Sequence, residues 1–440
     1  MPAGRRTTQA IAGTMTRELQ NLRVPAASAR AVRRQSDKEQ TVDPSSEFSS
    51  PLSGIKVLEF SHVQAGPVCG MMLADMGAEV TKVESSSGDL FRVPLEGANF
   101  HNFNRNKQAI ALNLKTQKGV EIALKLAQDA DVLLENFLPG ALDKLGLGYE
   151  PVRDRNPGIV YASISGFGQS GPLRNRPAFE PVLQAMSGIM DATGEADRAP
   201  ARVRPAMIDY CTGACTAFAI AAALLRRERT GRGERVDVAL LDIALYAMSP
   251  YITHFKRSGE LFPRTGSAHP ATAPNQNFET RDGFICIAAG ADHMWKSLCK
   301  GLDIEDAGGD PRFATQPLRA RHALEIGQII NRETRKHTGR ELEEKLLAAG
   351  VPCAKVRNIG EIADEPHVRE RGMLEETDHP AGGRMTTLKT PIVLSGRTSP
   401  MRRRAPMLGE NTRELLGRHG YAEAEIDAFI AAGVAVQHES

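Results

Sequence analysis

The feature that most constrains the fold is an alternation of short apolar runs with segments of helical period, which begins at Ile55. Five runs have the length and the apolar, β-branched composition of buried strands. They span residues 55–60, 79–84, 109–115, 131–137 and 159–164. Residues 66–76 and 117–127 have apolar side chains at helical spacing and separate successive strands. A strand, a helix and a second strand form a βαβ unit, so the pattern predicts an α/β fold with a parallel sheet.

Size and charge limit the kinds of protein to consider. The chain has 440 residues, of which 41% are hydrophobic, so it can bury a large core and we expect two domains. Its 55 basic and 53 acidic residues nearly cancel, which makes nucleic acid a poor partner. No run reaches the roughly 18 apolar residues of a membrane span. The six cysteines show no paired zinc spacing, so we expect reduced, mostly buried thiols, no metal site and no membrane partner.

The first 51 residues differ in composition from the rest. Seven arginines precede Asp37, with Glu18 as the one acid among them. An Arg-rich, Ser-containing and acid-poor segment is typical of a mitochondrial transit peptide, but a disordered tail or an upstream start codon gives the same pattern. We interpret residues 1–51 as a disordered or targeting extension. We expect a cytoplasmic protein, with the mitochondrial matrix as the alternative.

Two loops follow strands at places where α/β sheets bind ligands. Residues 61–67 follow the first strand, and the glycine-rich residues 165–172 follow the fifth. Such loops lie beyond the carboxyl ends of the strands, where a crevice forms in α/β proteins. The first loop lacks the G-x-G-x-x-G pattern, so the sequence does not indicate a dinucleotide.

Asp209 stands where polar sequence changes into an apolar helix that runs from Ala214 to Leu225. This position makes Asp209 a natural N-cap, whose carboxylate the helix end would hold in its ionised form. Capping alone is the commonest role of such an aspartate, so other motifs must decide whether it also has a chemical role. Farther along, residues 235–240 and 283–288 predict strands, and residues 242–251, 293–301 and 322–336 predict helices.

Eight short motifs occur in a set order along the chain. They are residues 54–60 (GIKVLEF), 62–67 (HVQAGP), 104–107 (NRNK), 112–116 (LNLKT), 135–140 (ENFLPG), 165–169 (SGFGQ), 229–233 (RTGRG) and 408–412 (LGENT). No single motif is diagnostic, but the ordered set resembles the class III CoA-transferases, of the formyl-CoA transferase and carnitine CoA-transferase type. The resemblance covers the chain from about Leu52 to its C-terminus.

The resemblance implies that Asp209 is the catalytic nucleophile, because moving CoA between acids requires a group whose acyl anhydride is as reactive as a thioester. It implies a CoA thioester as substrate, with no tightly bound cofactor. By the same resemblance Gln64 lies beside the reacting carbonyl, and Glu180 occupies an acidic position near the active site. Without the resemblance, Gln64 would be a polar loop residue and Glu180 a surface ion-pair partner.

The resemblance also implies a CoA cleft. The residues that match it are His62, Val63, Gln64, Ala65, Leu112, Lys115, Asn136, Phe137 and Lys144. The two lysines suit phosphates, although each would otherwise be read as an exposed surface residue. Relatives are homodimers of interlocked, ring-like chains, each with a Rossmann-like large domain and a smaller α+β domain. We place the large domain at 52–245 plus 345–440 and the small domain at 246–344.

Departures from the family pattern bear on the substrate. Ser85 replaces a basic residue that contacts CoA in formyl-CoA transferase, and residues 266–274 (GSAHPATAP) replace its glycine loop. The sequence therefore favours short dicarboxylic or hydroxy acids over formyl-CoA and oxalate. An α-methylacyl-CoA racemase is a second hypothesis, but its histidine is missing from Ala178-Phe179-Glu180, so its base is absent. A non-catalytic CoA-binding protein is the third hypothesis.

Overall fold

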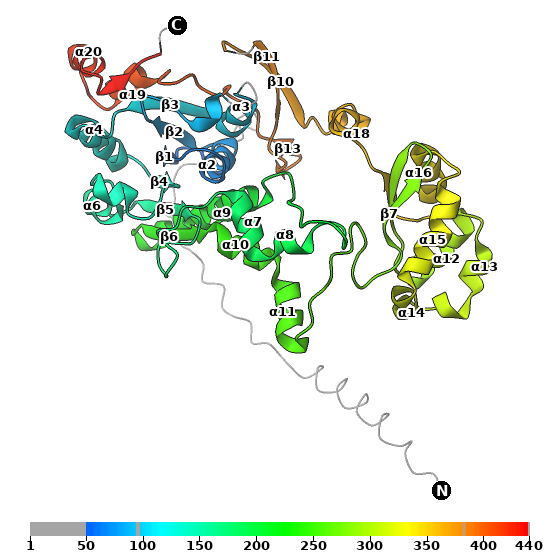
Figure 1. Ribbon diagram of the computed structural model, residues 1–440. Helices are drawn as coiled ribbons and strands as arrows, with labels where there is room; N and C mark the ends of the chain where they lie inside the picture. Colours follow the sequence, from blue (N-terminus) through cyan, green and yellow to red (C-terminus); the bar gives the residue numbers. More distant parts are fainter. Residues whose placement is uncertain (1–49, 94–96, 382, 439–440) are drawn as a thin grey trace, which may run out of the picture. The chain divides into compact units, whose positions relative to one another are not determined.

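The computed structural model describes residues 50–93, 97–381 and 383–438, so the predicted extension at residues 1–51 lies almost wholly outside the described residues. Its centre is a seven-stranded sheet with the strand order β14-β3-β2-β1-β4-β5-β6 (Figure 1). The strands are β1 (Lys56–Phe60), β2 (Glu79–Glu84), β3 (Lys107–Leu112), β4 (Val132–Glu135), β5 (Val160–Ser165), β6 (Glu234–Ala239) and β14 (Ala435–Val436). The predicted α/β class and parallel sheet are confirmed.

The order of the strands creates a switch point beside β1. Strand β1 pairs in parallel with β2 on one side and with β4 on the other, so the connections leave it in opposite directions. Six strands follow the order 3-2-1-4-5-6 that is typical of Rossmann-like sheets, and β14 is added antiparallel at the β3 edge. A crevice forms at such a switch point, outside the carboxyl ends of the strands.

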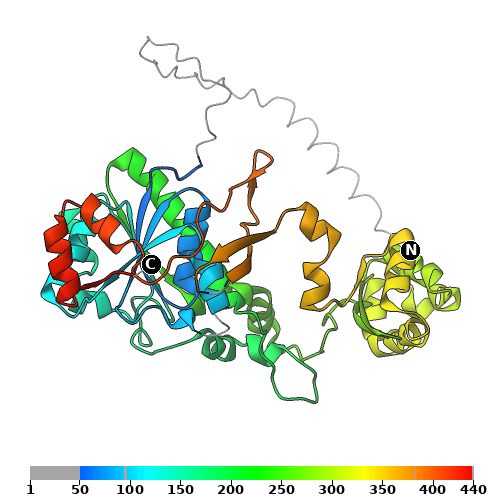
Figure 2. The same cartoon turned by 90° about the horizontal axis from the view of Figure 1, so that it is seen from above.

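Helices cover both faces of this sheet. One face packs against α2 (Ala65–Asp75), α7 (Glu180–Ser187), α9 (Met207–Thr230) and α10 (Leu240–Ala247). The other packs against α4 (Gln117–Gln128), α6 (Tyr149–Arg155), α19 (Thr412–Arg418) and α20 (Glu423–Ala431). Figure 1 shows α4 and α6 on the opposite side of the strands from α2 and α9. In Figure 2 the red C-terminal helices lie beside the cyan part of the chain, so residues from both ends build one core.

Helix α9 begins earlier than the sequence predicts. Its N-cap residue is Ala206, and its first backbone bond runs from the amide of Tyr210 to the carbonyl oxygen of Ala206. The predicted N-cap role of Asp209 is therefore wrong. The apolar run from Ala214 lies inside the helix, whereas the helix itself starts as soon as the chain has passed Pro205, and Ile208 in its first turn is already buried. Asp209 lies in the first turn, where its carboxylate is left for other contacts.

Helix α9 also packs unusually close to α2. A Cβ atom on Gly213 would lie 2.7 Å from Cγ1 of Val68 and 2.8 Å from the carbonyl oxygen of Ala65. Glycine therefore allows the approach that brings the first turn of α9 to the loop after β1. By length and composition α9 could cross a membrane, but it packs in the sheet core and 44% of its most apolar window is buried. We interpret it as a core helix.

A second sheet joins β7 (Asn275–Thr280), β8 (Gly283–Ala288) and β9 (Cys353–Lys355). Its core contains Trp295, Phe313 and Ile330. The helices of this region are α12 (Asp292–Gly301), α13 (Glu305–Gly309), η3 (Pro311–Phe313), α14 (Gln316–Arg321), α15 (Ala323–Thr334) and α16 (Gly339–Ala348). The proposed boundaries of the two domains stay a prediction.

Short elements complete the described chain. They are η1 (Leu90–Arg92), α3 (Ala98–Asn104), α5 (Ala141–Lys144), α8 (Ile189–Ala192), α11 (Ser249–Ser258), α17 (Ile359–Ala363), α18 (Pro366–Glu370), β10 (Leu374–His379), β11 (Gly383–Leu388), β12 (Val393–Leu394) and β13 (Arg397–Thr398). The helix predicted at 242–251 is two helices, because α11 starts anew with a proline in its first turn. All six cysteines are free, but Cys211, Cys215 and Cys286 are exposed, so the expectation of mostly buried thiols is wrong.

Candidate active site

The loop after β1 is held in a strained shape by side chains from elsewhere in the fold. Val63 has a φ of 66°, a value that a β-branched residue rarely adopts. Its amide donates to Oδ1 of Asp89 at 3.2 Å. The side chain of Asn136 receives a hydrogen bond from the amide of His62 and donates one to the carbonyl oxygen of His62. These contacts fix the position of Gln64, which follows Val63.

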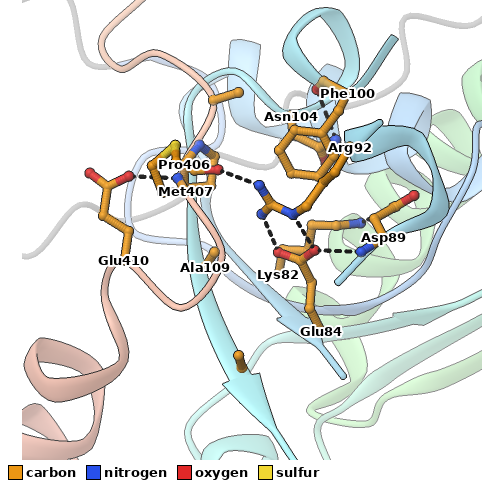
Figure 3. A network of polar contacts seen from close by, with 12 residues as sticks. Lys82, Glu84, Asp89, Arg92, Phe100, Asn104, Ala109, Pro406, Met407 and Glu410 are labelled. Atoms are coloured by element: carbon orange, nitrogen blue, oxygen red, sulfur yellow. Dashed lines mark hydrogen bonds and ion pairs between the residues drawn. The ribbon is translucent and has the colours of Figure 1, made fainter. Parts of the chain in front are cut away.

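A buried ionic network lies behind this loop (Figure 3). The ammonium of Lys82 lies 3.0 Å from Oδ2 of Asp89 and donates to the carbonyl oxygen of Ser61 at 2.6 Å. Arg92 forms two hydrogen bonds with Glu84 and lies 3.8 Å from the centre of the Phe100 ring. Burial alone would lower the pKa of Lys82, but the carboxylates around it, including Asp89, raise the pKa above its ordinary value. Lys82 therefore stays charged, and the network supports the loop after β1.

A second pair extends the network toward α2. Glu59 is fully buried and lies 2.8 Å from the ammonium of Lys107. A Cβ atom on Gly70 would lie 1.9 Å from Oε2 of Glu59, so glycine leaves room for this pair. Burial lowers the pKa of Lys107 to about 8. The pair is structural, because neither residue lines a cavity beside Asp209.

The carboxyl group of Asp209 is not held ionised, contrary to the expectation from sequence. Burial, and then the neighbouring Glu180 carboxylate, raise the pKa of Asp209 to about 7. Proximity to a helix N-terminus is worth about 0.3–1 kcal/mol, which is less than one pKa unit. The shift is about three units in the other direction, so burial and the like charge outweigh the helix. Near neutral pH the group is present in both protonation states.

Glu180 is itself held by a buried glutamine on the same helix. Nε2 of Gln184 donates to Oε1 of Glu180 at 2.6 Å and to the carbonyl oxygen of Val203 at 2.9 Å. Oε1 of Gln184 accepts a hydrogen bond from the amide of Val203, also at 2.9 Å. Gln184 is 1% exposed, so one buried amide side chain ties the start of α7 to the segment before α9.

Two cavities meet at Asp209. The strand-end cavity, of about 400 Å³, is lined by the loops after β1, β4 and β5, including His62, Asn136 and Gly166. The arginine cavity, of about 620 Å³, is lined by residues that include Phe91, Phe103, Arg202, Arg204 and Tyr210. The two linings have five residues in common, which are Val63, Gln64, Phe179, Glu180 and Asp209. The aspartate is thus accessible from either side.

The structure brings most of the predicted site residues together. The strand-end cavity is lined by Asp209, Gln64, Glu180, His62, Val63, Ala65, Asn136 and Phe137. Leu112 does not line it, because this side chain lies in the sheet core with no exposure. Lys115 and Lys144 are exposed and lie outside its lining. The assigned roles of all these residues stay predictions.

Sequence reasoning missed three basic residues. Arg176 lines the strand-end cavity, and Arg202 and Arg204 line the arginine cavity. The alternation Arg202-Val203-Arg204 shortly before Asp209 was an available signal, since alternate residues of an extended segment share a face. Within the described residues, no group of three or more His, Cys, Asp or Glu side chains could hold a metal ion.

Comparison with known proteins defines the class. Residues 52–412 match the CoA-transferase family III, and the chain belongs to this family of CoA-transferases, which act on acyl-CoA and carboxylic acids. It is 38% identical to a succinate–glutarate CoA-transferase of Agrobacterium fabrum, over 83% of this chain and 95% of that protein. It is 37% identical to a succinyl-CoA:mesaconate CoA-transferase of Haloarcula marismortui, over 84% of this chain and 96% of that protein. A crystal structure of a CAIB/BAIF family protein from Brucella suis, 36% identical, superimposes with a TM-score of 0.76 over 84% of this chain and all of that one.

Proposed function

We propose that the protein transfers CoA from an acyl-CoA donor to a short dicarboxylic or hydroxy acid, with Asp209 as the nucleophile. The observation that carries the proposal is the position of Asp209 on the wall that two cavities share. A CoA-transferase must hold the CoA thiol and an exchangeable acid at one reacting carbon. The curated relatives named for succinate, glutarate and mesaconate support dicarboxylic acids as substrates.

The proposed reaction begins with attack on the donor thioester. A carboxylate oxygen of Asp209 bonds to the thioester carbon while the carbon–sulfur bond breaks, which gives a mixed anhydride and CoA thiolate. The thiolate then attacks the aspartyl carbonyl and releases the first acid, leaving an aspartyl-CoA thioester. The acceptor carboxylate attacks the aspartyl carbonyl of this thioester and expels CoA thiolate, which gives a second mixed anhydride. The thiolate then attacks the acceptor carbonyl and releases the Asp209 carboxylate. The products are the new acyl-CoA and the free carboxylate of Asp209.

Gln64 and Glu180 have separate roles in this scheme. Gln64 is 8% exposed, and its side chain forms no hydrogen bond with another described residue, so its amide is available to an oxygen that gains charge. Glu180 raises the pKa of Asp209 and so favours its uncharged, acylated forms over the carboxylate. Neither role requires a bound metal or a tightly bound cofactor.

The thiol end of CoA fits the strand-end cavity in this proposal. That cavity lies at the switch point of the sheet, and Arg176 and His62 are its basic lining residues. Burial lowers the pKa of His62, so its imidazole is neutral at physiological pH and offers hydrogen bonds rather than charge. The exposed Lys115 and Lys144 remain candidates for phosphates outside the cavity.

Trapping of the acylated aspartate tests the proposal. The protein is incubated with succinyl-CoA and hydroxylamine, and its peptides are examined by mass spectrometry. We expect a hydroxamate at Asp209 and no turnover in Asp209→Ala. No adduct at Asp209, together with unchanged turnover in the alanine variant, would refute the mechanism. Exchange of the α-proton of a 2-methylacyl-CoA, without transfer to any acid, would support the racemase hypothesis instead.

We also propose that the chain acts as a homodimer. Helices α9 and α10 expose large apolar side chains, with Phe218 77% and Tyr246 81% exposed. An apolar surface of this kind on a soluble enzyme is usually covered by a partner subunit. Light scattering after serial dilution tests the homodimer. If a partner subunit covers the apolar side chains of α9 and α10, each chain should lose its fold when the dimer dissociates. A folded monomer at nanomolar concentration would refute the proposal.

A further inference from the structure

The arginine cavity is lined by two cations that have no anionic partner among the described residues. Arg202 and Arg204 are exposed at its wall, and neither forms an ion pair or side-chain hydrogen bond with a described residue. The acidic groups of the same lining are Glu180 and Asp209. Burial and Glu180 account for the raised pKa of Asp209, and neither arginine contributes to it. The two guanidinium groups are therefore available to an anion that enters the cavity.

The segment that carries these arginines is held in place by a buried side chain. Both backbone polar groups of Val203 are hydrogen-bonded to the amide of Gln184, which in turn donates to Glu180. The arginines on either side of Val203 are thus fixed relative to the acidic group beside Asp209. A cation whose backbone is fixed loses less entropy on binding than one on a free loop.

Part of the wall of the arginine cavity is apolar. Leu90, Phe91, Phe103 and Tyr210 all line the cavity, and the rings of Phe103 and Tyr210 meet edge to face with centroids 5.7 Å apart. Such a wall suits a short chain of methylene groups. The lining of the cavity therefore combines the carboxyl group of Asp209, apolar side chains and two cationic side chains.

We propose that Arg202 and Arg204 bind the distal carboxylate of a dicarboxylic acid while its other carboxylate reacts at Asp209. This inference rests on the proposed CoA transfer and assigns the residues that select a diacid over a monoacid. A guanidinium group binds a carboxylate with two parallel hydrogen bonds, which gives geometric selectivity. A monocarboxylic acid of equal length reaches the same wall but leaves both cations without a partner.

The test compares glutarate with pentanoate as acceptors, using one succinyl-CoA donor throughout. The measured quantity is the ratio of kcat/KM for the two acids, in which effects on the donor cancel. We expect Arg202→Gln and Arg204→Gln each to lower this ratio about 10- to 100-fold, chiefly through glutarate. Arg202→Lys should keep part of the preference for glutarate, because lysine keeps the positive charge but cannot form the two parallel hydrogen bonds of a guanidinium group. Arg198→Gln, an exposed arginine outside both cavity linings, is the matched control and should leave the ratio unchanged.

Two outcomes would overturn the assignment. An equal loss for both acids would mean that the arginines hold CoA or the fold, and an unchanged ratio would mean that they do not contact the acid. Calorimetric binding of glutarate and pentanoate to the free enzyme gives a readout that does not depend on turnover. If the unmodified protein transfers CoA to no acid, the proposed function fails. Preferential glutarate binding that is lost in Arg202→Gln would still establish the carboxylate site.

Discussion

Replacing Glu180 with glutamine tests how the reactivity of Asp209 is set. The pKa of Asp209 rises from 3.8 to about 7, a shift of about three units, or at most about 4 kcal/mol at 1.36 kcal/mol per unit. Burial is the larger cause and the Glu180 carboxylate the second. The part due to Glu180 is therefore less than half, or at most about 1.5 units. Glu180→Gln should lower the pKa of Asp209 toward about 6.

The pH dependence of kcat/KM for the acyl-CoA donor measures this change, because it reports the groups of the free enzyme. In the unmodified enzyme we expect activity to fall as the pH drops through about 7, since protonation removes the nucleophile. In Glu180→Gln this acidic limb should move to lower pH by about 0.5–1.5 units. The substitution is nearly isosteric and keeps an oxygen that can accept the hydrogen bond from Gln184.

An exposed glutamate gives the control. Glu150 on α6 pairs with Arg153 at the surface, and Glu150→Gln should leave the acidic limb where it is. A limb that stays in place in Glu180→Gln would show that the two carboxylates do not interact. A limb that moves to higher pH would show that Glu180 stabilises the charge on Asp209, contrary to the reasoning.

Three further outcomes follow from the structure. Because the raised pKa of Asp209 makes its charged form costly, Asp209→Asn should stabilise the protein increasingly as pH rises from 4 to 8, by at most about 4 kcal/mol; an equal effect at both pH values in urea unfolding would contradict this. Lys82→Met removes the fully buried partner of two acidic groups, Glu59 and Asp89, and should lower the free energy of unfolding by about 3–5 kcal/mol, measured in urea; a neutral result would show that the network is not needed. Gly213→Ala places a methyl group against Val68 and should cost about 1–3 kcal/mol and lower kcat, whereas Gly417→Ala, with open space around it, should do neither.

The sheet could be predicted from sequence because its strands are buried on both faces. Apolar runs such as Val132–Glu135 have little choice of structure once amphipathic segments separate them, and their ends were placed within a few residues. The start of helix α9 is harder to predict from sequence. One side of this helix is both exposed and apolar, so the apolar run does not mark the first turn. Pro205, rather than the first apolar run, marks the approach to this helix.

The site was only partly predictable for a related reason. Gln64 and Asp209 could be named from the motifs, but their shared position between two cavities depends on the close packing at Gly213. Arg202 and Arg204 belong to no motif of the resemblance. Only the hydrogen bonds between Gln184 and Val203 show that the segment is fixed beside the site.

The raised pKa of Asp209 has a consequence for the proposed reaction. Burial and the Glu180 carboxylate disfavour the charged form of Asp209, and any acyl or thioester derivative of the side chain is uncharged. The interactions that raise the pKa therefore also favour the mixed anhydride and the aspartyl-CoA thioester relative to the free carboxylate. An aspartate held ionised as a helix cap would gain stability from its charge and lose it on acylation. The first-turn position, which removes the capping role, thus fits a nucleophile better than the N-cap position that the sequence predicts.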